Sequence, residues 1–179
     1  MLILLSYAHI LNVQRDQKLI NLLKKNLNKA LVALIFSFIT IGILSYLSFQ
    51  VKYGIFLTGS FGSSMVLMFG YPESPFSQPK NVFFGHLVTS TICVLALMYL
   101  PIDQYLQIAL AVAFGIFFMI LLGITHPPAG GNPIVIILSA ATYKFLLFPI
   151  ISGAIIIILA AIIFHRFILK EHYPLSWKK

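Results

Sequence analysis

The chain has 179 residues, of which 60% are hydrophobic and only 9% are charged. A water-soluble domain needs far more charge on its surface, so this composition excludes a soluble protein. Several apolar runs approach or exceed the roughly 20 residues that cross a bilayer core of about 30 Å. We therefore expect an all-α polytopic membrane protein.

The formal net charge is +8, and the basic residues gather at the two ends of the chain. They precede the first long apolar run and follow the last one: Arg15, Lys18, Lys24, Lys25, Lys29, Arg166, Lys170, Lys178 and Lys179. The positive-inside rule then predicts two cytoplasmic termini and an even number of crossings in a plasma or inner membrane. Because topology and lipid headgroups account for this charge, we expect no nucleic-acid partner.

Residues 1–29 are expected to form an interfacial N-terminal segment, followed by a transmembrane domain at 30–168 and a basic tail at 169–179. Within the N-terminal segment, residues 15–29 have an amphipathic pattern typical of a helix lying in the membrane interface. Its apolar face consists of Leu19, Ile20, Leu22, Leu23 and Leu27, and lysines occupy the other face.

Four segments of the transmembrane domain are long enough to span the bilayer: 30–50, 81–100, 105–124 and 147–168. One broken segment, 53–72, lies between the first two spans, and a second, 125–143, lies between the last two spans. Each has small and polar residues followed by an apolar helix of about ten residues, which covers about half of a bilayer core. This order indicates an internal repeat, with units at about 30–100 and 105–168.

The number of crossings depends on the broken segments. If each one crosses, the chain has six crossings and two inverted three-segment repeats. If each is a re-entrant loop, there are four crossings and the halves are parallel. We favour six, because Lys80 then lies on the inner side and the loop at 101–104, which has no Lys or Arg, lies outside. Paired interrupted segments at matching positions of two halves also point to a transporter's substrate site.

The second broken segment begins with THPPAGGNP, residues 125–133. Pro127 and Pro128 are expected to end the preceding helix and to extend the backbone. Asn132 is expected to cap a helix at 134–143, with Pro133 as its first residue. In the first broken segment, the polar stretch 59–64 is expected to precede a helix that ends at Phe69.

Two half-helices whose N-termini meet inside the membrane would bind an anion or a dipolar solute. The alternative is that these small residues only allow close helix packing. The predicted pathway comprises Gly59, Ser60, Gly62, Ser63, Ser64, His86, Thr125, His126, Pro127, Pro128, Gly130, Gly131 and Asn132.

His126 could donate to an anion, act as a protonatable gate or bond to the local backbone. His86 starts a one-sided polar stripe on its helix, completed by Thr89, Ser90 and Cys93, which would line a cavity or join helices. Lys80 and Lys144 flank the broken segments and could steer anions, although reaching toward lipid headgroups also explains them.

Several chemistries lack the residues they need. The four acidic residues, Asp16, Glu73, Asp103 and Glu171, lie outside the predicted spans. The five histidines and the single cysteine show no metal-ligand spacing. We therefore expect no enzyme activity, no metal and no cofactor.

Three segments resemble the hallmark motifs of the HPP family of integral membrane proteins, in the same order. They are GSFGSSMVLMFG at 59–70, SPFSQPKNVFFGHL at 74–87 and THPPAGGNP, which contains the tripeptide His126-Pro127-Pro128. The resemblance covers roughly residues 30–168. Family members are described as four-helix membrane proteins, and plant chloroplast and cyanobacterial members are linked to nitrite transport.

The sequence and the resemblance together predict a channel or secondary transporter for a small inorganic anion, with nitrite implied by the resemblance. One alternative is a channel for water or small neutral solutes. Another is a non-transporting membrane scaffold or sensor. We expect a homo-oligomer in the lipid bilayer.

Overall fold

The computed structural model describes residues 2–50 and 56–175. The chain is 83% helical, and no strand occurs in these two ranges. The all-α prediction is therefore confirmed. Lys52, Lys178 and Lys179 lie outside the described residues.

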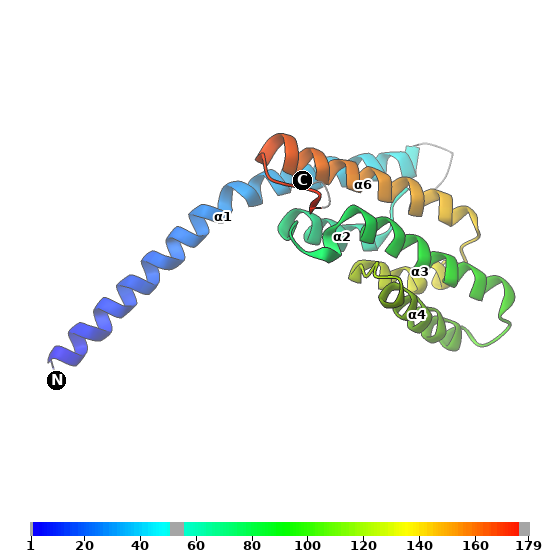
Figure 1. Cartoon of the computed structure of the whole chain (residues 1–179), viewed down its shortest axis with the longest axis horizontal. Helices are drawn as coiled ribbons and strands as arrows, with labels where there is room; N and C mark the ends of the chain where they lie inside the picture. The colour runs from blue at the N-terminus through cyan, green and yellow to red at the C-terminus, as the bar shows by residue number, and fades with distance from the viewer. Residues whose placement is uncertain (1, 51–55, 176–179) are drawn as a thin grey trace. The chain divides into compact units, whose positions relative to one another are not determined.

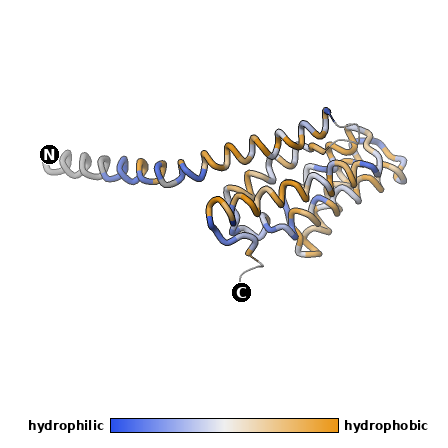
Figure 2. Tube along the Cα trace, turned by 90° about the horizontal axis from the view of Figure 1, so that it is seen from above, coloured by the Kyte–Doolittle hydropathy of each residue, from blue (hydrophilic) through white to orange (hydrophobic). Residues whose placement is uncertain are grey.

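The first helix, α1 (Leu2–Gln50), passes through two units, Met1–Ile35 and Phe36–Lys179. The predicted amphipathic segment 15–29 is helical and continues without a break into the first span. Its leucines are exposed to the surroundings, and Figure 2 shows hydrophilic and hydrophobic residues mixed along this part of the helix. Its placement in the membrane interface stays a prediction.

The second unit contains the rest of the chain (Figure 1). Its elements are α2 (Gly59–Gly70), the 3-10 helix η1 (Pro75–Ser77), α3 (Pro79–Tyr99), α4 (Gln104–Leu121), the 3-10 helix η2 (Pro127–Gly131), α5 (Asn132–Leu138), the π-helix η3 (Leu146–Ile151), α6 (Ser152–Ile162) and the π-helix η4 (Ile163–Leu169).

Among the described residues, four helical stretches are long and apolar enough to cross a membrane: Gln14–Gln50, Pro79–Tyr99, Gln104–Leu121 and Leu146–Leu169. The last three match predicted spans closely, whereas the first includes the predicted span 30–50 and begins well before it. In a bilayer, a helix pairs its backbone N–H and C=O groups internally, which favours this fold for apolar runs. The last stretch is kinked at Phe148 (φ −132°, ψ 109°), just before Pro149.

The first broken segment runs antiparallel to the second half of α1. Near its start, the Phe56 N–H donates to Ser48 Oγ at 2.8 Å. Near its end, the Phe69 ring packs on Phe164, which also contacts Phe36 of α1. Between these two contacts, the first broken segment therefore runs back along the second half of α1.

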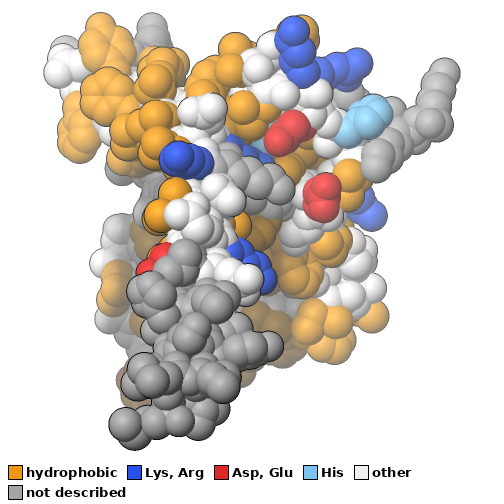
Figure 3. Space-filling view, turned by 90° about the vertical axis from the view of Figure 1, so that its left-hand side faces the viewer, with side chains coloured by type: hydrophobic (Ala, Val, Ile, Leu, Met, Phe, Trp, Pro, Cys, Tyr) orange, Lys and Arg blue, Asp and Glu red, His pale blue; other side chains and the backbone are white. Residues whose placement is uncertain are grey.

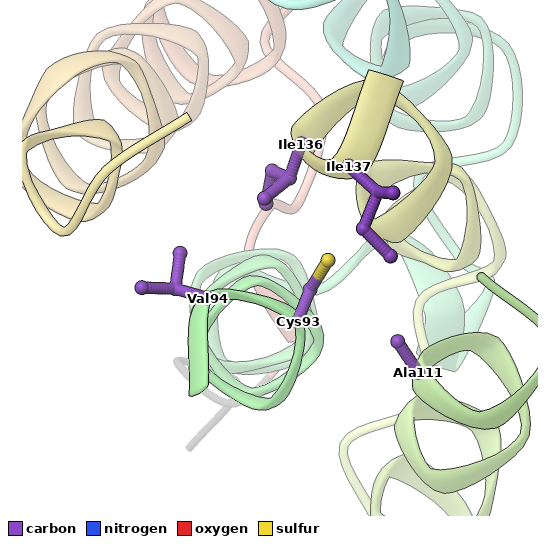
Figure 4. Close-up of a cluster of buried hydrophobic side chains, with 5 residues drawn as sticks. All are labelled: Cys93, Val94, Ala111, Ile136 and Ile137. Carbon is purple, nitrogen blue, oxygen red and sulfur yellow. The ribbon is translucent and has the colours of Figure 1, made fainter. Parts of the chain in front are cut away.

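The second broken segment runs alongside α3 in the same direction. At its start, Asn81 Nδ2 donates to the Thr125 carbonyl at 3.0 Å. Further along, Cys93 Sγ donates to the Pro133 carbonyl at 3.3 Å. The core cluster in Figure 4 lies beyond this point, with Cys93 and Val94 from α3, Ala111 from α4, and Ile136 and Ile137 from α5.

The C-terminal tail folds back onto the start of α3. The Tyr173 hydroxyl donates to the Ser77 carbonyl at 2.7 Å, and the Leu175 N–H donates to Gln78 Oε1 at 2.8 Å. We call residues 170–175 the C-terminal clasp. The clasp places the end of the chain at the same end of the bundle as the loop before α3.

The polar stretch 59–64 is not a loop before a helix, as the sequence suggested. It forms the first turns of α2, which begins at Gly59. Burial of Phe61, Met65 and Met68 on one face outweighs the weak helix propensity of glycine and serine.

The second motif also differs from its prediction. His126, the residue before the prolines, is extended (φ −136°, ψ 99°), whereas residues 127–131 form the 3-10 helix η2 and not extended backbone. Asn132 is not an N-cap: it has helical φ and ψ, and η2 leads directly into α5. Because the 3-10 turns of η2 run directly into α5, the backbone N–H groups at the start of α5 do not form a free helix N-terminus. The helix stops at Leu138, before Ala140 at φ +47°.

Candidate functional site

A buried polar cluster lies where the two broken segments meet α3. It contains Ser60 and Ser64 of α2, His86 of α3, His126 before η2, and Asn132 of α5. Ser64, His86 and His126 have no exposed surface, and Ser60 is 7% exposed. All five were predicted pathway residues, and residues up to 72 positions apart in the chain meet here.

The direction of the hydrogen bonds in the cluster follows from one backbone carbonyl together with the neutral state of both imidazoles. His126 Nδ1 lies 2.7 Å from the Phe76 carbonyl oxygen, which can only accept, so this nitrogen carries a proton. In a neutral imidazole the other nitrogen, Nε2, must then accept. Its partner at 2.8 Å is Ser64 Oγ, whose single proton has two acceptors, this nitrogen and the Ser60 carbonyl at 2.9 Å. With His126 neutral, the proton points to Nε2.

The same reasoning extends through Ser64 to His86. Ser64 Oγ gives its proton to His126, so it accepts from His86 Nε2–H at 3.0 Å. His86 Nδ1 then accepts from Asn132 Nδ2 at 3.0 Å. This order makes His86 the Nε2–H tautomer and His126 the Nδ1–H tautomer.

Asn132 joins the first turns of the two short helices. Its Oδ1 accepts from Ser60 Oγ at 2.7 Å, while its Nδ2 also donates to Ser90 Oγ at 3.0 Å. The amide therefore bonds to α2 with its oxygen and to α3 with its nitrogen.

The polar stripe of α3 faces α5. Thr89 Oγ1 lies 3.4 Å from Asn132 Nδ2, and Cys93 bonds to the backbone of α5. All four stripe residues are buried. In this structure the stripe joins helices and lines no open cavity.

The cluster is complete without any charge. Both imidazoles are neutral in the order given above, and each ring nitrogen has a partner from the protein. Ser152 Oγ is the one buried side-chain N or O atom of the described residues that lacks a hydrogen-bond partner, and it belongs to α6. The site is thus closed and self-satisfied in this conformation.

The other predicted pathway residues lie outside the cluster. Gly59, Gly62 and Ser63 are exposed on the opposite face of α2. Pro127 is exposed, and the next residues of the motif are half-buried: Pro128, Gly130 and Gly131. Thr125 contributes its carbonyl to Asn81 and its hydroxyl to the Met119 carbonyl at 3.3 Å.

Both lysines predicted to steer anions are exposed. Lys144 lines a cavity of about 750 Å³ between the end of α5 and the start of η3, together with Ser139, Thr142 and mostly apolar neighbours. Figure 3 shows charged side chains interspersed with hydrophobic ones on the face that it draws. Neither lysine has a recorded contact with the polar cluster.

Close approach of backbones occurs at glycines that the sequence did not single out for the site. A Cβ at Gly85 would lie 2.8 Å from His126 Cβ, and one at Gly153 would lie 2.2 Å from the Phe61 ring. Around Gly62, Gly130 and Gly131, by contrast, a Cβ would meet nothing within 4 Å. No other backbone therefore approaches Gly130 or Gly131 closely, and their contact with a solute stays a prediction.

The sequence reasoning also missed His165. Its Nε2 donates to the Met68 carbonyl at 2.7 Å, and its Nδ1 lies 2.8 Å from the Glu171 carboxylate. The spacing of His165 and Glu171, six residues apart across a helix end, offered no signal. In the described part of the chain, no three His, Cys, Asp or Glu side chains are placed to hold a metal ion.

Spanning-length apolar helices around a buried polar cluster define a polytopic α-helical membrane protein. The chain belongs to the HPP family: the family model described as "HPP, transmembrane region" matches residues 23–174. The resemblance noted from the motifs is therefore confirmed.

Two curated relatives are described as transmembrane proteins of Dictyostelium discoideum. One is 37% identical over 151 residues, covering 79% of this chain and 49% of its own length. The other is 35% identical over 128 residues, covering 68% of this chain and 45% of its own length. The chain thus spans about half the length of these relatives. No solved structure matches it.

Proposed function

We propose that this protein is a channel or secondary transporter for a small inorganic anion, with nitrite as the first candidate. The observation that carries the proposal is the buried cluster of hydroxyl, amide and imidazole groups inside a bundle of apolar helices. Polar side chains at membrane depth are costly unless they bond to one another, and they commonly mark solute pathways. Nitrite comes from the family resemblance.

The solute would pass between α2 and α5, whose first turns meet at Ser60 and Asn132. Because the cluster is closed, passage requires these helices to separate, exposing the hydroxyls, the Asn132 amide and the two imidazoles to the solute. Neutral donors of this kind can bind an anion without a full buried counter-charge. Lys80 and Lys144 would attract anions toward the two ends of the path.

We further propose six crossings arranged as two inverted three-segment repeats, with both termini cytoplasmic in a plasma or inner membrane. The directions of the two broken segments support this arrangement, since each runs along a neighbouring span. The clasp supports it too, because an odd number of crossings between α3 and the tail would separate Ser77 from Tyr173.

A homo-oligomer is part of the proposal. Gly59, Gly62 and Ser63 form an exposed row of small residues on α2, and such rows allow close helix association in membranes. The mass of the detergent-solubilised complex checks this.

Enzyme activity is not proposed, although Ser64 and His126 are close enough to resemble a nucleophile and its base. The Ser64 hydroxyl is fully buried and also binds His86. A neutral-solute channel is the second candidate, because the cluster carries no charge. A scaffold or sensor would need the cluster only for packing.

Flux into proteoliposomes tests the proposal. We expect nitrite uptake above that of empty vesicles, which corrects for diffusion of nitrous acid. Asn132→Leu removes the bonds of Asn132 to Ser60 Oγ and His86 Nδ1, at a cost of about 1–3 kcal/mol, and should lower uptake per folded molecule about tenfold or more. Thr91→Val removes a hydroxyl that bonds only within α3 and should transport normally.

The alternatives give different results in the same vesicles. Osmotic swelling without anion flux would favour the neutral-solute channel. No flux of either kind from folded protein would favour the scaffold and contradict transport.

A further inference from the structure

We propose that His86, Ser64 and His126 form a proton relay that takes up one proton per transport cycle, so that the anion moves together with H⁺. This inference rests on the proposed transport function. It concerns the same cluster, but it assigns to it a second substrate, the proton.

The geometry is that of a continuous hydrogen-bonded chain. The two imidazole centroids are 5.0 Å apart, and Ser64 Oγ lies 3.0 Å from one ring and 2.8 Å from the other. A hydroxyl can accept and donate at once, and an imidazole can accept at one nitrogen while releasing at the other. All three groups can therefore pass a proton along the chain.

The transfer balances in the following way. A proton binds at His86 Nδ1, and the Nε2–H bond of His86 breaks as its proton passes to Ser64 Oγ. The original hydroxyl proton of Ser64 passes to His126 Nε2. The net change is one added proton and one positive charge on His126, whose Nδ1–H still donates to the Phe76 carbonyl.

The same step would alter the contact between the short helices. After the transfer His86 Nδ1 carries a proton, so it no longer accepts from Asn132 Nδ2. The Asn132 amide must turn over to present Oδ1, which directs Nδ2 toward Ser60. Ser60 then changes from donor to acceptor, and its own proton can turn toward Thr58 Oγ1, 3.5 Å away. Protonation is thereby linked to the contact that must open for the solute.

No other ionisable side chain has a recorded contact with the two rings among the described residues. The rings contact Phe61 and Ser64 from α2, Asn132 from α5 and the Phe76 carbonyl from η1. The Asn132 side chain in turn bonds to Ser60, Thr89 and Ser90. The nearest charged residue on α3, Lys80, is exposed, as are all four carboxylates of the chain. The histidines are thus the ionisable groups of this cluster.

The first test reads the tautomers directly and does not depend on transport. We expect ¹⁵N NMR of the wild-type protein in lipid to show His86 protonated at Nε2 and His126 at Nδ1. Acidification should protonate the pair in one joint step. Variants His86→Gln and His126→Gln assign the signals. Opposite tautomers, or two rings that titrate independently, would overturn the relay.

The second test measures coupling in proteoliposomes that contain a pH-sensitive dye. With one proton per anion, an inward gradient of one pH unit should raise nitrite accumulation about tenfold and acidify the lumen. Ser64→Ala should abolish this coupling, and Thr91→Val should retain it. A melting curve for each variant shows that it is folded.

The outcomes separate the two proposals. Nitrite uptake that ignores the pH gradient and moves no protons would overturn the relay and leave the transport function standing. If a pH gradient drives protons but no nitrite, and Ser64→Ala abolishes this movement, the result would support the relay and contradict anion transport. Neither flux, with folded protein, would overturn both.

Discussion

At the scale of single residues, the Phe76 backbone carbonyl determines the chemistry of the site. It accepts from His126, and with both imidazoles neutral the donor and acceptor roles through Ser64, His86, Asn132 and Ser60 follow from that bond. In the closed cluster both nitrogens of His126 are occupied, Nδ1 by the Phe76 carbonyl and Nε2 by Ser64, so the ring has no free donor for an anion. The anion would have to bind after the cluster opens.

The tight glycine of the site is Gly85, not the glycines of the broken segments. In Gly85→Ala the added Cβ would meet His126 Cβ at 2.8 Å and the Ile124 carbonyl at 3.2 Å. Because backbone surrounds it, we expect a loss of about 1–3 kcal/mol and weaker retention of His126 in the cluster. Thermal melting in detergent measures the loss.

The matched control is Gly62→Ala, on an exposed helical position with no atom within 4 Å of the new Cβ. It should match or exceed the wild-type stability, by up to about 1 kcal/mol. Equal melting temperatures for the two variants would show that the segment before η2 can shift away without cost.

At the scale of elements, the C-terminal clasp connects the last helix to the loop before α3. Tyr173 is buried against His165, with ring centroids 5.1 Å apart, and its hydroxyl bonds to Ser77. Glu171 contributes both its carboxylate and its backbone N–H, which donates to the His165 carbonyl at 2.8 Å. These contacts hold the tail on the end of the bundle.

The clasp should open at alkaline pH. Burial raises the pKa of the Tyr173 hydroxyl above its usual range, so folding favours the protonated form. Its stabilising effect is complete below the pKa of the unfolded chain, about 10, and is lost as pH rises through the folded value. We expect protease cleavage of the tail to accelerate only at such high pH.

Tyr173→Phe removes both the titration and the bond to Ser77. It should cost about 1 kcal/mol at neutral pH and show no further Tyr-dependent loss above pH 10. If the variant and the wild type lose the tail with the same pH profile, another group controls the clasp.

At the scale of the whole molecule, the proposal of six membrane crossings predicts on which side of the membrane each loop lies. In the six-crossing arrangement, Lys80 lies on the same membrane face as the tail, and Asp103 lies on the other. Single cysteines at Lys80, Asp103 and Lys170, labelled from each side of sealed vesicles, test this. Cys93 is buried and bonded to Pro133, so its background labelling should be low.

The expected result is that cysteines at Lys80 and Lys170 react from one face and the cysteine at Asp103 from the opposite face. The four-crossing arrangement instead places Lys80 opposite Lys170. Labelling of these two positions from different faces would therefore contradict the six-crossing proposal.

The sequence alone determined the class of protein and the order of its long helices. Apolar runs of spanning length can satisfy their backbone in a bilayer only as helices, so the four spans were readable from composition and length. The three motifs also identified the family. The side chains that form the cluster were recognisable as polar residues at membrane depth.

Only the tertiary structure decided what those polar residues do. Propensity favoured an irregular stretch at 59–64 and a cap at Asn132, but burial of one face of α2 and the bonds to Ser60 and His86 outweighed local preferences. The close approach at Gly85, the role of the Phe76 carbonyl and the clasp through Tyr173 depend on segments distant in the chain. No local pattern encodes such pairings, because they arise from how the broken segments pack between the spans.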